Sequence, residues 1–157
     1  MIINSIVQDL KQKLPAKGRI LALDIGLKRV GVAICDELRL TVRPIKTLKR
    51  TSWKELLKAT IELIKKYDVV ALVLGLPMNI DGTENEMTHH VKRLYRNYSL
   101  SLDIPVFLQD ERLTSLEAES RLKSKGYSLK EIKLLCDVEA ACIILSDFLS
   151  KLDDSKF

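Results

Sequence analysis

Three acidic side chains have the type and the placement that chemistry at a phosphate would need. Asp24 and Glu111 each end an apolar run of the sequence, and Asp137 is expected to open a helix. A carboxylate at the end of a buried strand costs free energy unless a cation lies beside it. If the three converge at one edge of a sheet, their oxygens suit Mg²⁺ or Mn²⁺. Such a site favours hydrolysis of phosphodiester bonds.

Each of these acids also has an ordinary structural explanation. Asp24 could belong to a turn together with Gly26, since Asp and Gly are common in turns. Glu111 could form a surface ion pair with Arg112, which would add little stability. Asp137 could stabilise the N-terminus of a helix through the helix dipole. What favours a joint site is the placement that follows from the expected fold.

The first part of the sequence predicts an antiparallel meander of three strands. Residues 19–24 and 29–36 are rich in Ile, Leu, Val and Ala, and Gly26 lies in the short connection between them. Residues 41–48 alternate in polarity, and Pro44 places this third strand near an edge of the sheet. Because the connections are short, neighbouring strands should run antiparallel.

Helices and strands alternate in the rest of the chain. Residues 68–75 and 105–109 predict two further strands, and the first, apolar throughout, should be parallel and buried on both faces. Four helices should begin at a Ser or Thr that is followed three residues later by Glu, namely Ser52, Thr83, Thr114 and Ser128. A closing helix is expected over residues 138–150. Together these elements predict an α/β fold, with a five-stranded mixed sheet flanked by helices.

The predicted fold brings the three acids together. Ligands of α/β sheets collect at the carboxyl ends of strands, where Asp24 and Glu111 lie. Asp137 shares a helical face with residues that must pack on the sheet, namely Ala140, Ala141, Ile144 and Phe148. We therefore expect Asp24 to bridge two metal ions, while Glu111 and Asp137 hold one ion each.

The loop after the strand at 68–75 offers groups that could bind a sugar-phosphate backbone. Its candidate binding residues are Asn79, Asp81, Gly82 and Thr83. A simple strand-to-helix turn that ends in a cap at Thr83 explains the loop equally well. Basic residues beside the acids are candidates for phosphate contacts, namely Lys28, Arg29 and Arg112.

Composition limits the class of protein. The chain has 157 residues, of which 46% are apolar and 30% charged, as in ordinary globular proteins. No apolar stretch approaches the roughly 20 residues that span a membrane. The first ten residues include Asp9 and lack the basic start of a signal peptide. The three cysteines form no C-x-x-C pair, so we expect a cytoplasmic protein with free thiols.

Charge and length favour a single domain with a polyanionic partner. The formal net charge is +5 and the sequence pI about 9.1, which favours nucleic acid as a partner. The length suits one domain over residues 1–157. Its core should cover about residues 19–150, with an N-terminal extension over 1–18 and a tail over 151–157. The sequence leaves open whether the protein is a monomer or a homodimer.

Four blocks of the sequence resemble the signature motifs of the YqgF/RuvX family, whose members are described as Holliday junction resolvases or pre-16S rRNA nucleases with an RNase H-like fold. The blocks follow the order of the family between about residues 19 and 150, and they are Leu23–Ala33, Gly75–Glu84, Asp110–Glu119 and Asp137–Ala141. The resemblance places the family's acidic triad on Asp24, Glu111 and Asp137. It implies metal-dependent cleavage of structured nucleic acid, with a role in maturing the 5′ end of 16S rRNA.

Two positions depart from the family pattern and keep alternatives open. Leu27 stands where the family usually has Thr or Ser, and Val138 stands where it usually has Ser. Neither change removes a metal ligand, although the first removes a hydroxyl and the second weakens the expected helix cap. The 5′ flank of precursor 16S rRNA is the expected substrate, with branched DNA as the alternative. A non-catalytic nucleic-acid-binding module in ribosome assembly or transcription is the remaining alternative.

Overall fold

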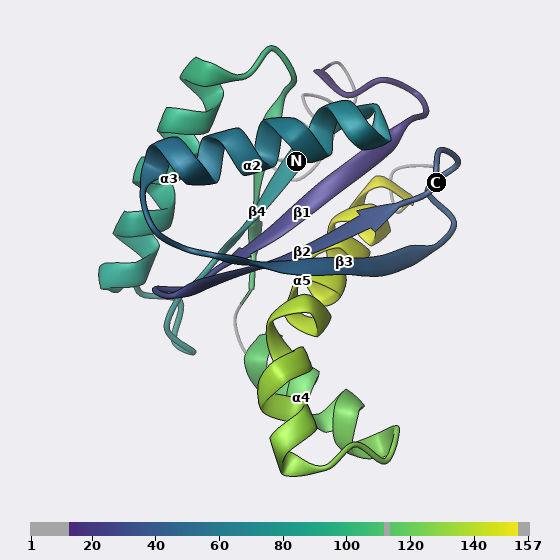
Figure 1. Cartoon of the computed structure of the whole chain (residues 1–157), viewed down its shortest axis with the longest axis vertical. Coiled ribbons are helices and arrows are strands. Elements are labelled where there is room, and N and C mark those ends of the chain that lie inside the picture. Colours follow the sequence, from purple (N-terminus) through teal and green to yellow (C-terminus); the bar gives the residue numbers. More distant parts are fainter. Residues whose placement is uncertain (1–12, 112–113, 154–157) are drawn as a thin grey trace.

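The chain folds into one mixed sheet with helices on both faces (Figure 1). The computed structural model describes residues 13–111 and 114–153. Its elements are β1 (Arg19–Ile25), β2 (Arg29–Cys35), β3 (Val42–Lys49), α2 (Trp53–Tyr67), β4 (Val69–Leu76), α3 (Glu86–Ser101), β5 (Val106–Asp110), α4 (Thr114–Ser124) and α5 (Leu129–Asp153).

The sheet has the predicted topology. Its strand order is β3-β2-β1-β4-β5. The pairs β1–β2 and β2–β3 are antiparallel, and the pairs β1–β4 and β4–β5 are parallel. An antiparallel meander is thus joined to two parallel strands, as expected from the sequence. The carboxyl ends of β1, β4 and β5 therefore lie at the same edge of the sheet.

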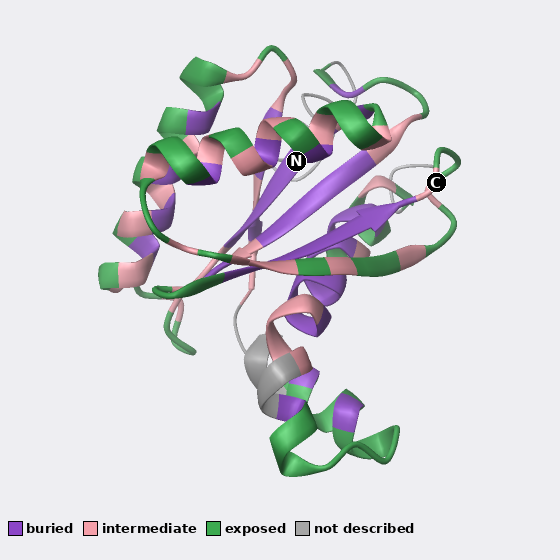
Figure 2. Ribbon diagram, in the orientation of Figure 1, coloured by how far each residue is buried: buried purple, intermediate pink, exposed green. Residues whose placement is uncertain are grey.

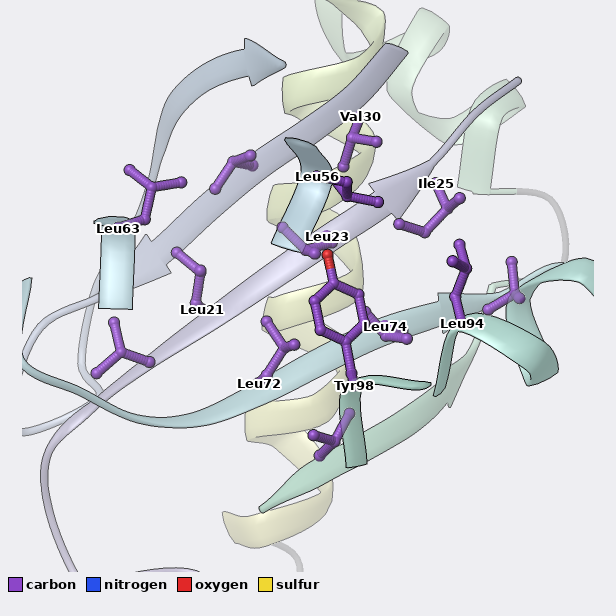
Figure 3. Close-up of a cluster of buried hydrophobic side chains, with 14 of the residues drawn as sticks. Leu21, Leu23, Ile25, Val30, Leu56, Leu63, Leu72, Leu74, Leu94 and Tyr98 are labelled. Atoms are coloured by element: carbon purple, nitrogen blue, oxygen red, sulfur yellow. The ribbon is translucent and has the colours of Figure 1, made fainter. Parts of the chain in front are cut away.

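Alternating side chains of the strands face two separate cores. Leu21 and Leu23 of β1 face helices α2 and α3, where they pack around Leu56 and Tyr98 (Figure 3). The other face of β1 packs against α5 in a second core, whose members include Ile20, Ala22, Ala141, Ile144 and Phe148. Asp24 has the same parity along β1 as Ile20 and Ala22, which directs it toward the α5 face. The buried strands between the two helical layers appear purple in Figure 2.

The last helix differs from its prediction. A short helix from Ser128 and a separate closing helix over residues 138–150 were expected, but α5 runs without a break from Leu129 to Asp153. Ser128 does begin it, since its hydroxyl accepts a hydrogen bond from the amide of Glu131. Residues 129–137 contain no Gly or Pro that would stop a helix. Asp137 therefore lies within α5, not at its start, and Val138 weakens no helix cap.

The cap of α3 also differs from its prediction. Asn85, not Thr83, is the N-cap, and its side chain accepts a hydrogen bond from the amide of Thr88. The Thr88 hydroxyl accepts one in return from the amide of Asn85. Thr83 lies in the preceding loop, where its hydroxyl donates to Asp81 and accepts from the amide group of Asn79. The Ser52 cap of α2 is confirmed by the hydrogen bond that it accepts from the amide of Glu55.

Helices α4 and α5 form a projection beyond the sheet. The second half of α5 lies against the strands, whereas its first turns and α4 extend away from them (Figure 1). The two helices pack on each other through Ala118, Ala140 and Ile143, with Cys136 against this cluster. The three cysteines are free thiols, as expected. Within the described ranges, no helix is both long and apolar enough to cross a membrane.

Candidate active site

Asp24 and Glu111 reach the same edge of the sheet from two strands that are not neighbours. Asp24 is the penultimate residue of β1, and Glu111 directly follows β5. Strand β4 lies between these two strands. The amide of Glu111 donates a hydrogen bond of 3.1 Å to the carbonyl of Leu76, which fixes the chain where it leaves β5. The two carboxyl groups must therefore meet over the end of β4.

Gly75 of β4 provides the space in which they meet. A Cβ atom added at Gly75 would lie 2.8 Å from Oε2 of Glu111 and would also overlap the side chain of Ile144 on α5. Any larger residue would displace one of the two. The glycine thus forms a gap in the sheet surface beneath α5, and the side chain of Glu111 fills part of it.

A hydrogen bond joins the side chains of Asp24 and Glu111. The pKa of Asp24 is raised from 3.8 to about 6, mainly by burial and in lesser part by the negative charge of Asp137, while the hydrogen bond from Glu111 lowers it. Burial, together with the charge of Asp24, raises the pKa of Glu111 from 4.5 to about 9. Glu111 is therefore the protonated partner near neutral pH and donates to the Asp24 carboxylate.

Asp137 lies beside this pair but is bound elsewhere. The backbone of α5 crosses β2 at Gly31, where an added Cβ would lie 2.9 Å from the amide nitrogen of Val138 and overlap the carbonyl of Asp137. This close approach carries Asp137 to the sheet, as its helical face predicts. Its Oδ2 atom, however, forms an ion pair of 3.0 Å with Nε of Arg29. The side chain of Asp137 is 27% exposed.

The carboxyl oxygens of the three acids suit a hard divalent cation, but the three side chains do not form a closed metal site as they are arranged here. Across the described parts of the chain, no three His, Cys, Asp or Glu side chains are grouped closely enough to hold a metal ion as they stand. The structure brings Asp24 and Glu111 together, while Asp137 is turned to Arg29. The two half-buried carboxyl groups in contact offer only oxygen ligands, and a cation would offset the cost of ionising both.

The basic residues of the β1–β2 turn have different roles. Lys28 is exposed, whereas Arg29 is held by Asp137. Sequence reasoning missed Arg50, whose guanidinium donates to the carbonyl of Gly26 at 3.2 Å and whose amide donates to the carbonyl of Lys28 at 2.9 Å. Arg50 therefore braces the turn that carries both cations. Its place directly after β3, opposite the turn, was the available signal. Arg112 lies outside the described residues.

The loop between β4 and α3 uses its polar side chains to hold its own shape. Asp81 accepts hydrogen bonds from the amide and the hydroxyl of Thr83, and the Asn79 amide group donates to the same hydroxyl. Asn79 also accepts from the side chain of Asn85. Gly82 has a φ of 88°, in the region that favours glycine. The predicted substrate contacts of these residues stay a prediction, and their structural role is clear.

Comparison with known proteins points in one direction. A family model described as "RuvX: Holliday junction resolvase" matches residues 18–151. A protein of Anaeromyxobacter sp. (strain K) named "Putative pre-16S rRNA nuclease" is 40% identical over 133 residues, covering 85% of this chain and 97% of that protein. A protein of the same name from Orientia tsutsugamushi (strain Ikeda) is 39% identical over 156 residues, covering 99% and 98%.

Solved structures of resolvases share the fold. The RuvC protein of Thermus thermophilus, in complex with a Holliday junction substrate, superposes with a TM-score of 0.54 at 13% identity, covering 87% of this chain and 96% of that one. The fowlpox virus resolvase, in complex with Holliday junction DNA, has a TM-score of 0.52 at 15% identity, covering 85% and 98%. At these identities the likeness shows the fold alone. The expected RNase H-like fold class is confirmed.

Proposed function

The chain belongs to the RuvX family, and from this premise we propose that it is a nuclease that hydrolyses phosphodiester bonds at Asp24, Glu111 and Asp137. The observation that carries the proposal is the contact between the side chains of Asp24 and Glu111 above Gly75, at the carboxyl edge of the sheet. A fold that only needed stability would not bring two half-buried carboxyl groups into contact, because ionising both is costly there. Perturbed acids that converge in this way are typical of functional sites.

The carboxyl groups have distinct tasks in this proposal. Asp24 and Glu111 would hold Mg²⁺ or Mn²⁺ once their shared proton is lost, with Asp24 common to two ions. Asp137 would complete the site by leaving Arg29, to which it is bound at 3.0 Å. The bound cations would supply an activated water and charge stabilisation for the leaving oxygen. The chain itself contributes the niche above Gly75 that keeps the two acids together.

Cationic side chains beside the acids would position the substrate. Lys28 is exposed in the braced β1–β2 turn, and Arg29 becomes available for a phosphate when Asp137 turns away from it. Such contacts fix the position of a nucleic acid without reading its sequence. The loop from Asn79 to Thr83 is pre-formed by its internal hydrogen bonds and lies at the same edge of the sheet. It would contact the sugar-phosphate backbone as a rigid surface.

The names of the relatives indicate the substrate. Proteins about 40% identical over most of the chain are named for precursor 16S rRNA, so the 5′ flank of that RNA is the substrate that we propose. The family description names Holliday junctions instead. Phosphate contacts and metal ligands do not distinguish RNA from DNA, so experiment has to separate the two.

A side-by-side cleavage assay tests the proposal. A precursor 16S rRNA 5′ fragment and a four-way DNA junction are each incubated with the chain and Mg²⁺ or Mn²⁺. Asp24→Asn should abolish cleavage, whereas Asp103→Asn, which changes an exposed aspartate before β5, should leave it intact. Cleavage of the RNA alone supports rRNA maturation, and paired cuts in the junction support a resolvase.

Two outcomes contradict the proposal. Activity that persists in Asp24→Asn shows that the acids are not the catalytic site. No cleavage of either substrate, with salt-sensitive binding intact, supports a non-catalytic nucleic-acid-binding module.

A further inference from the structure

The projection formed by α4 and α5 ends in a cluster of cations. Residues 121–130, here called the basic tip, contain four basic residues and no acidic one, namely Arg121, Lys123, Lys125 and Lys130. All four are exposed. Figure 2 shows this end of the molecule as almost entirely exposed, well away from the sheet. The tip therefore presents positive charge to solvent.

The turn at the tip has a defined geometry. The amide of Gly126 donates to the carbonyl of Lys123, and the amide of Tyr127 donates to the carbonyl of Leu122. This pair of hydrogen bonds is a Schellman motif, and it requires the left-handed conformation that Gly126 adopts with a φ of 88°. Ser128 then caps α5. The cations are thus carried by a fixed helical hairpin.

Helix stability explains only part of this charge. Basic residues near the C-terminus of α4, such as Lys123, interact favourably with the helix dipole. Arg121 and Lys125 also pair with the buried Glu139, each at 3.5 Å. Lys130, however, lies in the first turn of α5, where a positive charge opposes the dipole. Its presence there needs another reason.

Apolar groups accompany the cations. Leu129 is 72% exposed and Tyr127 is 40% exposed. The hydroxyl of a tyrosine among basic side chains can bind a phosphate oxygen beside the cations. The first acidic residue after the tip is Glu131.

Both helices of the projection lead directly to the proposed active site. Helix α4 begins three residues after Glu111, and α5 carries Asp137 eight residues after its first residue. At 1.5 Å per residue the start of α5 lies about 12 Å from Asp137 along the helix. That distance corresponds to roughly three or four phosphates along one strand of a duplex.

We propose that the basic tip binds the phosphate backbone of a nucleic acid duplex that extends from the active site. The inference rests on the proposed function for the identity of the substrate, but it concerns binding and not cleavage. It assigns a second contact region, separate from the acids, that sets how the duplex is aligned with the scissile bond. Charge complementarity is the reason for choosing a nucleic acid over a protein partner.

Binding measurements on the full-length chain test this proposal. Fluorescence anisotropy of a labelled RNA duplex is recorded in EDTA, which keeps the duplex intact, over a range of salt concentrations. The double variant Lys123→Gln/Lys130→Gln is compared with Lys54→Gln/Lys58→Gln. The second pair removes the same charge from exposed positions on α2, across the sheet.

The tip variant should bind about 60-fold more weakly at 0.1 M salt, because each lost phosphate contact costs about 8-fold there. Its slope of log K against log salt should fall by about 2. The α2 variant should change both quantities little, and Lys123→Arg/Lys130→Arg should bind normally. A DNA duplex should behave like RNA, since the backbone charge is common to both.

The alternatives give different results. Equal weakening in both glutamine variants, an unchanged slope in the tip variant, or no salt-dependent binding by the unmodified chain overturns the proposal. If the unmodified chain cleaves its substrate but the tip variant binds nucleic acid normally, the proposed role of the basic tip is wrong and the proposed function stands. If the unmodified chain binds nucleic acid through the tip but cleaves no substrate, the proposed function is wrong and the proposed role of the tip stands.

Discussion

Glu111 donates a hydrogen bond to Asp24 across Gly75, so that two acids from strands that are not neighbours share one proton. The glycine is as necessary to this contact as the acids themselves, because a Cβ there would lie 2.8 Å from the Glu111 carboxylate. The pair carries one negative charge while it keeps this proton, and loss of the proton adds a second.

The metal-free chain should lose stability as the pH rises. The pKa of Asp24 is raised from 3.8 to about 6 and that of Glu111 from 4.5 to about 9 in the folded chain. The folded state therefore holds more protons than the unfolded state between about pH 4 and 9. The free energy of unfolding should fall across this window, by up to about 1.4 kcal/mol per pH unit for each proton retained. Urea unfolding in EDTA at pH 5 and pH 9 measures it.

Divalent cations should reverse this loss. Added Mn²⁺ or Mg²⁺ should raise the unfolding free energy more at pH 9 than at pH 5, because the ionised pair binds the cation and the protonated pair does not. Asp24→Asn serves as the control and should weaken both the pH effect and the metal effect. An unfolding free energy that is the same at both pH values would contradict the shared proton.

Removal of Arg29 should free Asp137 for the metal. In Arg29→Gln, the ion pair of 3.0 Å is lost, and the affinity for Mn²⁺ should rise by up to about 5-fold, the value of an exposed ion pair. Titration calorimetry without nucleic acid measures this change. Lys28→Gln removes the neighbouring exposed charge and should have a smaller effect. Weaker Mn²⁺ binding in Arg29→Gln would indicate that Arg29 holds Asp137 in its ligating position.

Gly31→Ala should displace α5 and with it Asp137. The new methyl group would overlap the carbonyl of Asp137, and such overpacking typically costs about 1–3 kcal/mol. The melting temperature and the cleavage rate should both fall. For comparison, Gly126→Ala meets no atom within 4 Å and should cost about 1 kcal/mol through its φ of 88° alone. A neutral Gly31→Ala would mean that α5 adjusts without moving the site.

Leu27→Thr tests the departure from the family pattern in the β1–β2 turn. Leu27 is 75% exposed, so the change should alter the unfolding free energy by less than about 0.5 kcal/mol. If the missing hydroxyl limits catalysis, the cleavage rate should rise while the melting temperature stays the same. Exposed Thr41→Leu is the matched reverse change on the β2–β3 connection and should not affect cleavage. An unchanged rate in Leu27→Thr would show that the hydroxyl is dispensable here.

The sequence alone predicted those parts of the candidate site that depend on which face a strand residue points to and on where the strand ends. Asp24 and Glu111 meet as expected because each directly follows a run of buried residues whose alternation fixes its face. The packing face of Asp137 was likewise readable from Ala141 and Ile144, which are both buried. These features follow from local patterns of apolar and polar residues, so they can be predicted from a single sequence.

The sequence was insufficient where side chains choose between competing partners. Asp137 pairs with Arg29, and Thr83 binds Asp81 in preference to capping α3. Both outcomes depend on distances that only the folded chain sets. The unbroken α5 was missed because a Ser–Glu cap at residues 128–131 and an acid at residue 137 both resemble helix starts. Local helix propensity decided in favour of one helix.

Helix α5 also ties the site to the cooperativity of folding. The same 25-residue helix covers one face of the sheet and carries Asp137. Any partial unfolding that withdrew this acid would expose the core around Ile144 and Phe148. Local unfolding at low free-energy cost, which many enzymes use for regulation, is therefore not available to this part of the molecule. Asp137 therefore stays at this edge of the sheet whenever the strands and α5 are folded together.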